Sequence, residues 1–211
     1  MRKALLLSNT ALSSNGGIQT YRRYLTNCLL NNGYIVDFVY RDIKSEEKIK
    51  NLNYFNIERK YNIPKVFNII FTAYYLAKTK YDAVLISHIN YIVLAPILKL
   101  LFKKNIVLFV YGIDVKGLSY IKKKSCSFVD LIISHSNFTK LNFLKNFDFF
   151  KKFIIPIGGP FEEKKKIKIK SKNKLVNITS VTRIEKADSY KNIYKIVKSL
   201  VILKKKKINF V

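Results

Sequence analysis

Two glycines occupy a turn early in the chain. Gly16 and Gly17 stand between the apolar run Ala4–Ser8, which predicts a strand, and Ile18–Asn31, which predicts a helix. Glycine lets the backbone approach a phosphate closely, and the N–H groups and dipole of the helix attract the anion. The segment is neither GxGxxG nor a P-loop. A tight turn requiring positive φ explains the pair equally well.

Two basic residues late in the chain could act on the same kind of ligand. Arg183 follows the apolar run Leu175–Val181, and Lys191 falls in the first turn of the helix predicted over Ser189–Leu203. A guanidinium fork beside an ammonium group suits the neutralisation of a diphosphate leaving group. Arg183 is the more informative of the two, because a lone lysine in such a lysine-rich chain is ordinarily a solvated surface residue.

Three further polar residues stand at the ends of predicted strands. His88 and His135 close the segments AVLISH and LIISHS, and Asp114 follows IVLFVYG. Open α/β sheets bind ligands at the carboxyl ends of their strands, so we expect all three residues to face a cleft. A neutral histidine there is as often a hydrogen-bonded core residue as a ligand contact. No carboxylate pair, metal-spaced cluster or GxSxG motif occurs, so we expect no metal site.

The elements that would position these residues alternate between strand and helix. The predicted strands are apolar on both faces, as in a parallel sheet covered by helices on both sides. This order predicts a doubly wound α/β domain. The strands are Ala4–Ser8, Ile35–Tyr40, Ala83–Ser87, Ile106–Tyr111, Leu131–Ser134 and Phe153–Ile157, and the helices are Ile18–Asn31, Val66–Lys78, Tyr91–Phe102, Gly117–Lys124 and Phe138–Asn146.

The alternation breaks at a turn followed by a lysine-rich run. We expect a first domain over 1–159, a linker over 160–174, and the first βα unit of an incomplete second Rossmann-like domain over 175–211. One βα unit cannot bury its own apolar surface. The sequence therefore predicts a fragment, from a truncated or split gene or a partial sequence.

Composition narrows the class of protein. The 211 residues hold 40 Lys+Arg against 13 Asp+Glu, a formal net charge of +27, yet 49% are hydrophobic, which excludes a disordered basic tail. Lysine dominates the charge and is dispersed, so we expect compositional bias rather than specific nucleic-acid binding, which relies on clustered arginine. Two cysteines favour a reducing compartment. The apolar stretches are too short for an export signal or a spanning helix, so we expect a cytoplasmic protein.

Six segments together resemble one enzyme family. They are GGIQTYRRYL, VLISHINYIVLAPI, VLFVYGIDV, DLIISHSNFTK, IIPIGG and VTRIEKADSYKNIYKIVKSL. Their order and spacing, over nearly the whole chain, are similar to those of family 4 glycosyltransferases, retaining enzymes of the GT-B fold in which two Rossmann-like domains face a cleft. The resemblance implies a hexosyltransferase-type enzyme that transfers a sugar from a nucleotide-sugar to a saccharide or lipid-linked acceptor with retention, in cell-surface polysaccharide synthesis.

The resemblance also implies roles for the basic and glycine residues. Gly16 and Gly17 resemble the loop that lies against the donor diphosphate. Arg183 and Lys191 resemble the catalytic pair that neutralises this diphosphate from the second domain. With that pair present, the resemblance implies neither a metal nor a cofactor besides the donor.

On the acceptor side the implied contacts are less regular. Tyr111 stands where many members carry a histidine before glycine, and Asp114 follows it. These two residues and His88 are expected to contact the acceptor or the sugar. The family's paired glutamates would fall after position 211, so we expect the chain to be inactive alone and to need the rest of the second domain, for which a separate chain is a candidate partner.

Two alternatives remain open. A basic amphitropic module without catalysis would bind an anionic membrane or polyanion, and lysines gathered on one surface would favour it. Peripheral contact with the inner face of the plasma membrane is also compatible with a glycosyltransferase that uses lipid-linked acceptors. A dehydrogenase-like nucleotide-binding protein would need a ribose-binding acid, for which Asp37 is the candidate, but the missing GxGxxG disfavours it.

Overall fold

The computed structural model describes residues 2–14, 16–41, 48–56, 78–112, 117–145, 154–158 and 193–206. The chain divides into two compact units, Met1–Glu162 and Glu163–Val211. In the second unit the described part is helix α7 (Ile193–Lys205). It starts inside the helix predicted over Ser189–Leu203 and extends two residues beyond the predicted end. The predicted linker and the strand predicted over Leu175–Val181 lie outside the described residues.

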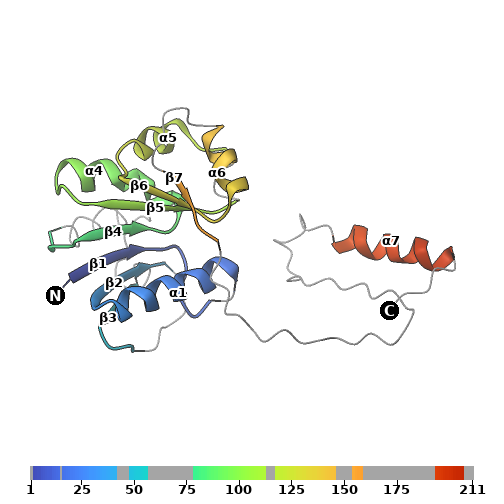
Figure 1. Ribbon diagram of the computed structural model, residues 1–211, viewed down its shortest axis with the longest axis horizontal. Coiled ribbons are helices and arrows are strands. Elements are labelled where there is room, and N and C mark those ends of the chain that lie inside the picture. Colours follow the sequence, from blue (N-terminus) through green and yellow to red (C-terminus); the bar gives the residue numbers. More distant parts are fainter. Residues whose placement is uncertain are drawn as a thin grey trace. The chain divides into compact units, whose positions relative to one another are not determined.

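The first unit contains a seven-stranded sheet in which every ladder is parallel (Figure 1). Its order is β3-β2-β1-β4-β5-β6-β7, so the chain starts in the middle, winds to one edge and returns to wind to the other. This topology confirms the predicted doubly wound α/β fold. The strands are β1 (Arg2–Leu7), β2 (Tyr34–Tyr40), β3 (Leu52–Asn56), β4 (Ala83–Ile86), β5 (Ile106–Val110), β6 (Leu131–Ser134) and β7 (Ile154–Pro156).

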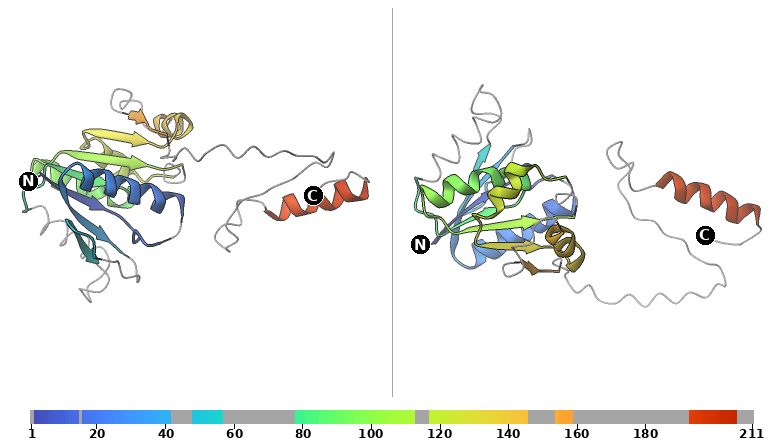
Figure 2. Two further views of the ribbon diagram at one scale, coloured as in Figure 1. Left: turned by 60° about the horizontal axis from the view of Figure 1, so that its bottom comes forward. Right: turned by 90° about the horizontal axis from the view of Figure 1, so that it is seen from above.

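Helices cover both faces of the sheet (Figures 1 and 2). Strand β1 shows why, because Leu6 joins one apolar cluster while Leu5 and Leu7 join another, as the alternation of side chains along a strand requires. Residues of α1 pack against the first cluster, and Leu98, Cys126 and Phe143 from the opposite helices belong to the second. The helical elements are α1 (Gly17–Asn31), η1 (Ile89–Leu94), α4 (Ala95–Leu100), α5 (Tyr120–Cys126) and α6 (Asn137–Leu144).

Three local predictions differ from the structure. Strand β3 was not predicted, because its apolar residues are flanked by asparagines, and within the described part of the sheet it is an edge strand beside β2. The helix predicted over Tyr91–Phe102 is a 3-10 turn followed by α4, since Pro96 favours the first turn of a helix and cannot continue one. Helix α5 begins at Tyr120 rather than at Gly117, where φ is 66°. The predicted helix Val66–Lys78 lies outside the described residues except for Lys78.

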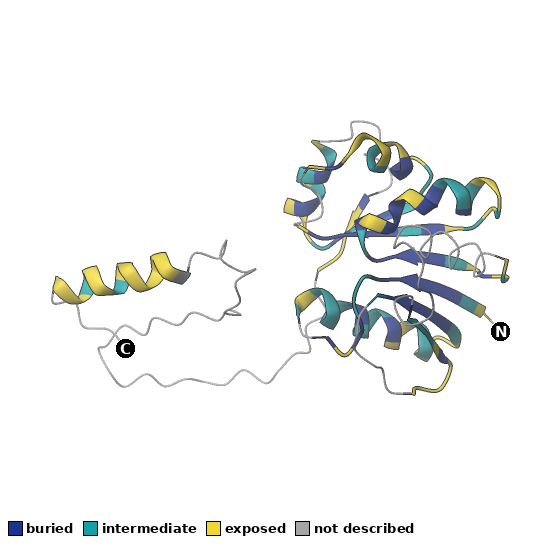
Figure 3. Ribbon diagram, turned by 180° about the vertical axis from the view of Figure 1, so that it is seen from behind, coloured by how far each residue is buried: buried dark blue, intermediate teal, exposed yellow. Residues whose placement is uncertain are grey.

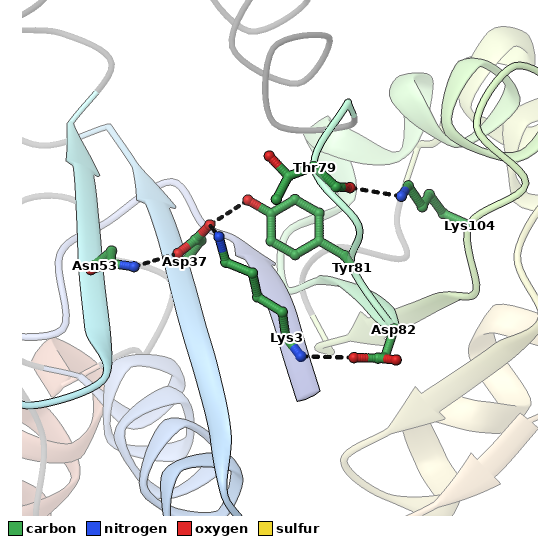
Figure 4. Close-up of polar contacts among 7 residues, drawn as sticks. All are labelled: Lys3, Asp37, Asn53, Thr79, Tyr81, Asp82 and Lys104. Carbon is green, nitrogen blue, oxygen red and sulfur yellow. Dashed lines mark hydrogen bonds and ion pairs between the residues drawn. The ribbon is translucent and has the colours of Figure 1, made fainter. Parts of the chain in front are cut away.

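A polar cluster on the amino-terminal side of the sheet joins strands that are distant in sequence (Figure 4). Asp37, in β2, is 2% exposed and lies 3.0 Å from Lys3 Nζ in β1. It accepts hydrogen bonds from Asn53 Nδ2 at 2.7 Å and from the Tyr81 hydroxyl. We call this the amino-edge cluster, and its members are Lys3, Asp37, Asn53, Thr79, Tyr81, Asp82 and Lys104.

Candidate functional site

The opposite, carboxyl edge of the sheet collects five of the residues singled out in the sequence. Gly16 and Gly17 follow β1, His88 follows β4, Tyr111 directly follows β5, and His135 directly follows β6. The carboxyl ends of parallel strands lie at one edge, so this placement follows from the topology. The other predicted site residues, Asp114, Arg183 and Lys191, lie outside the described residues.

The two glycines of the first turn differ in what the chain requires of them. Gly16 has φ 147°, and a Cβ added there would lie 2.3 Å from Gln19 Oε1. At Gly17 an added Cβ would meet no atom within 4 Å. The turn therefore accounts for Gly16, whereas the described part of the chain imposes no requirement for glycine at position 17.

Helix α1 begins without a side-chain cap. Gly16 is its N-cap, no side-chain hydrogen bond caps the helix, and its first turn contains no acidic residue. The first helical bond runs from Thr20 N to Gly16 O at 2.9 Å. An uncapped helix start carries partial positive charge and donor N–H groups, which is an arrangement that binds anions.

Two arginines of α1 shape the loop before it. Arg22 is 1% exposed, and its guanidinium donates to Thr10 Oγ1 at 2.7 Å and to the Ser87 carbonyl at 2.8 Å. Arg23 donates to the carbonyls of Leu12 and Ser14 at 2.5 and 3.1 Å. These bonds join the turn to the end of β4, next to His88. Arg22 was not predicted from the sequence, although its position four residues after Ile18, on the apolar stripe of the helix, could have indicated it.

His88 is a half-buried residue that caps the 3-10 turn. Its Nδ1 accepts a hydrogen bond from Asn90 N at 3.2 Å. Burial, assisted by the charges of Arg22 and Lys122, lowers the pKa of His88 to about 4. The ring is therefore neutral at pH 7, and because Nδ1 accepts, the proton resides on Nε2. Such a ring can donate a hydrogen bond to a hydroxyl group.

Three aromatic rings meet between α1 and the ends of β5 and β6. Tyr111 stacks on His135 with ring centroids 4.4 Å apart, and Tyr21 meets His135 edge-on at 4.1 Å. Within the described part of the chain, His135 Nε2 is buried and has no hydrogen-bond partner, and burial lowers the pKa of this histidine. Tyr111 is 5% exposed, so its ring belongs to this packing. A contact between Tyr111 and a sugar stays a prediction.

Asp37 does not lie where a ribose-binding acid would be needed. It is in the body of β2 rather than at the carboxyl end, and its carboxylate is engaged by Lys3, Asn53 and Tyr81. This arrangement removes the residue on which the dehydrogenase-like alternative depended.

Comparison with known proteins places this fold in a structural class. No family profile and no curated protein sequence matches the chain. Solved structures do match, and they show that the described sheet is the Rossmann-like fold found in one half of GT-B glycosyltransferases. The chain spans about half the length of the structures it matches.

Three of these structures illustrate the match. The lipopolysaccharide outer core galactosyltransferase WaaB, in its apo form, has a TM-score of 0.61 at 16% identity, over 83% of this chain and 51% of its own. Sucrose-phosphate synthase from Thermosynechococcus elongatus has a TM-score of 0.58 at 17% identity, over 75% and 48%. Anabaena Alr3699/HepE in complex with UDP has a TM-score of 0.53 at 12% identity, over 76% and 44%. At these identities the likeness concerns the fold.

Neither a membrane-spanning helix nor a cluster of metal-ligating side chains occurs within the described residues. No helix there is long and apolar enough to cross a bilayer. No group of three or more His, Cys, Asp or Glu side chains there is placed to hold a metal ion.

Proposed function

We propose that the described sheet is the acceptor-side half of a retaining GT-B glycosyltransferase. The complete enzyme would transfer a hexose from a nucleotide-sugar to a saccharide or lipid-linked acceptor, in the synthesis of cell-surface polysaccharide. The observation that carries the proposal is the uncapped start of α1, with open space at Gly17, at the carboxyl edge of this fold. Among the matching structures, one of Alr3699/HepE holds UDP and another UDP-glucose, which makes UDP the first ligand to test.

Each predicted site residue has a role in this proposal. The N–H groups at the start of α1 lie against the donor diphosphate, because Gly17 leaves the backbone accessible. Arg183 and Lys191 neutralise the leaving nucleoside diphosphate. His88 Nε2–H donates to a hydroxyl of the acceptor or the transferred sugar. Asp114 stands on the same side.

Titration of the ¹⁵N-labelled chain with UDP tests the glycine site directly. We expect the amide signals of Gly17 and Ile18 to shift with UDP and not with uridine, because the diphosphate is the group recognised. Gly17→Val should weaken binding at least tenfold by blocking close approach. Asn27→Val, which places the same β-branched residue at an exposed position of α1, is the matched control and should bind UDP normally. Unshifted amides over residues 16–18 at saturating UDP would contradict the proposal.

The role of Arg183 has its own test. Arg183→Ala should weaken UDP binding about tenfold or more, since a hydrogen bond to a charged group contributes roughly 1.5–3 kcal/mol. Lys198→Ala removes a positive charge from an exposed position of α7 and serves as the control. Equal losses in the two variants would show that only net charge matters.

A further inference from the structure

Helices α4 and α5 leave large apolar side chains exposed to solvent. Leu100 and Leu101 at the end of α4 are 65% and 69% exposed, and Tyr120 and Ile121 at the start of α5 are 77% and 67% exposed. A groove with a volume of about 280 Å³ separates the helices. Its lining residues are Pro96, Tyr120, Ile121, Lys124, Ser125 and Phe128.

We call the groove together with the exposed apolar residues of these two helices the α4–α5 surface. Leu100 lies one helical turn after Pro96, which lines the groove, and therefore on the same side of α4. Helix α6 lies on the same face of the sheet as α4 and α5 (Figure 1), and parts of it are exposed (Figure 3). Its Phe138 and Leu141 are exposed as well. Contiguous exposed apolar patches of this kind mark interaction sites in soluble domains.

Lysines occur on the same two elements as this apolar surface. Lys103 follows α4, and Lys122, Lys123 and Lys124 lie on α5. The described residues between positions 93 and 130 include one acidic residue, Asp130. Its Oδ1 lies 2.5 Å from Lys99 Nζ. Within the described residues, the surface therefore combines exposed leucine, isoleucine and tyrosine with an excess of positive charge.

We propose that the α4–α5 surface docks on an anionic lipid bilayer. Leu100, Tyr120 and Ile121 enter the boundary between headgroups and acyl chains, while the lysines contact lipid phosphates. A second copy of the chain fits this surface poorly, because face-to-face pairing would bring the two sets of lysines together. A nucleic acid fits it poorly as well, because the patch presents mainly aliphatic side chains and no arginine.

The docked surface would adjoin the candidate site. Lys122 Nζ donates to Asn90 Oδ1 at 2.6 Å, and Asn90 N in turn donates to His88 Nδ1 at 3.2 Å. The docking proposal is argued from the exposed apolar and basic residues alone. The role of docking, which is to bring a bilayer-borne acceptor beside His88, rests on the proposed function. Vesicle binding and UDP binding are separate measurements, so either proposal can fail alone.

Vesicle co-sedimentation of the whole chain tests the docking surface. We expect binding to vesicles of phosphatidylcholine mixed with phosphatidylglycerol and at least tenfold weaker binding to phosphatidylcholine alone. Leu100→Ser/Ile121→Ser should reduce binding to the mixed vesicles at least tenfold. Val197→Ser/Val201→Ser removes two apolar side chains, each 52% exposed, from α7 and should change binding less than twofold.

A second pair of variants separates local charge from the overall charge of +27. Lys123→Gln/Lys124→Gln should weaken binding several times more than Lys48→Gln/Lys50→Gln, which removes the same charge from another exposed segment. Three results would overturn the proposal: equal losses in the two lysine variants, greater dependence on α7 than on the α4–α5 surface, or lipid-free dimers that the Leu100→Ser/Ile121→Ser change dissociates. Circular dichroism at equal temperature confirms that the variants compared are folded.

Discussion

The two edges of the sheet use polar residues in opposite ways. At the amino-terminal side, Asp37 is surrounded by donors from three other segments, and Lys3 N donates to Asp82 Oδ2 at 2.7 Å (Figure 4). At the carboxyl edge, helix α1 starts without a side-chain cap, and within the described residues His135 Nε2 is buried without a hydrogen-bond partner. One edge satisfies its polar groups internally, and the other retains hydrogen-bonding capacity.

This difference indicates how stability and binding are divided in the molecule. Bonds within the amino-edge cluster connect strands and hold the sheet in register. Unused donors at the carboxyl edge cost stability, and a ligand that accepts hydrogen bonds would recover that cost. Substitutions at the first edge should therefore reduce the free energy of unfolding, whereas those at the second should act mainly on binding.

The largest effect is expected for Asp37→Ala. Removing the carboxylate leaves Asn53 and Tyr81 without their acceptor and Lys3 without its ion pair, so the free energy of unfolding should fall by about 3–5 kcal/mol. Urea unfolding measures this change. Lys99→Ala, which breaks the more exposed pair with Asp130 and leaves the bond from Ile106 N to Asp130 Oδ2 intact, should cost only about 1 kcal/mol. Similar losses of unfolding free energy in both variants would show that the amino-edge cluster stabilises the fold no more than an exposed ion pair does.

The glycine pair tests the carboxyl edge. Gly16→Ala should destabilise the protein by about 1–3 kcal/mol, because alanine is strained at φ 147°. Gly17→Ala should leave stability unchanged or raise it by about 0.4–1 kcal/mol, through the reduced entropy of the unfolded chain. Thermal unfolding of the two variants gives the comparison. Equal destabilisation would mean that the turn requires both glycines.

Acidification should expose the cost of burying His88. The unfolded chain takes up this proton near pH 6.5 and the folded chain near pH 4, so between these values the unfolded state binds more protons. The contribution of His88 to stability is complete above pH 6.5 and is lost as the pH falls toward 4, on the order of 1–2 kcal/mol between pH 7 and 5.

The control for this pH dependence is His88→Asn. Asparagine retains an acceptor for Asn90 N but does not titrate, so its unfolding free energy should decrease less between pH 7 and 5 than that of the unaltered protein. Parallel curves for the two proteins would show that His88 titrates alike in the folded and unfolded states.

The smallest effect on stability is expected for His135→Phe. The ring retains its stacking on Tyr111, and the buried Nε2 that lacks a partner is removed, so the free energy of unfolding should change by less than about 1 kcal/mol. Chemical denaturation measures it. A loss above 2 kcal/mol would indicate that Nε2 is satisfied within the protein and that the carboxyl edge resembles the amino edge more closely than we propose.

Prediction from the sequence succeeded for elements whose apolar pattern is strong. Leu131–Ser134 was predicted with the bounds observed for β6, and Ile18–Asn31 differs from α1 by one residue. It failed for β3, whose three apolar residues are too few to define a periodicity. At the site, the glycine turn and the carboxyl-edge position of His88 could be predicted, but the different requirements of Gly16 and Gly17 could not, because they depend on φ and on the position of Gln19.

The amino-acid sequence alone determined the alternation of strands and helices, because apolar periodicity is a property of neighbouring residues. Only the tertiary structure decided the partners of the buried polar groups. Arg22 bonds to the carbonyl of Ser87, 65 residues away, and Tyr81 bonds to Asp37 across 44 residues. These contacts depend on the order in which the strands pair, and many orders share one periodicity. The same strand order places the internally hydrogen-bonded Asp37 cluster at one edge of the sheet and the uncapped start of α1, proposed to bind a ligand, at the other.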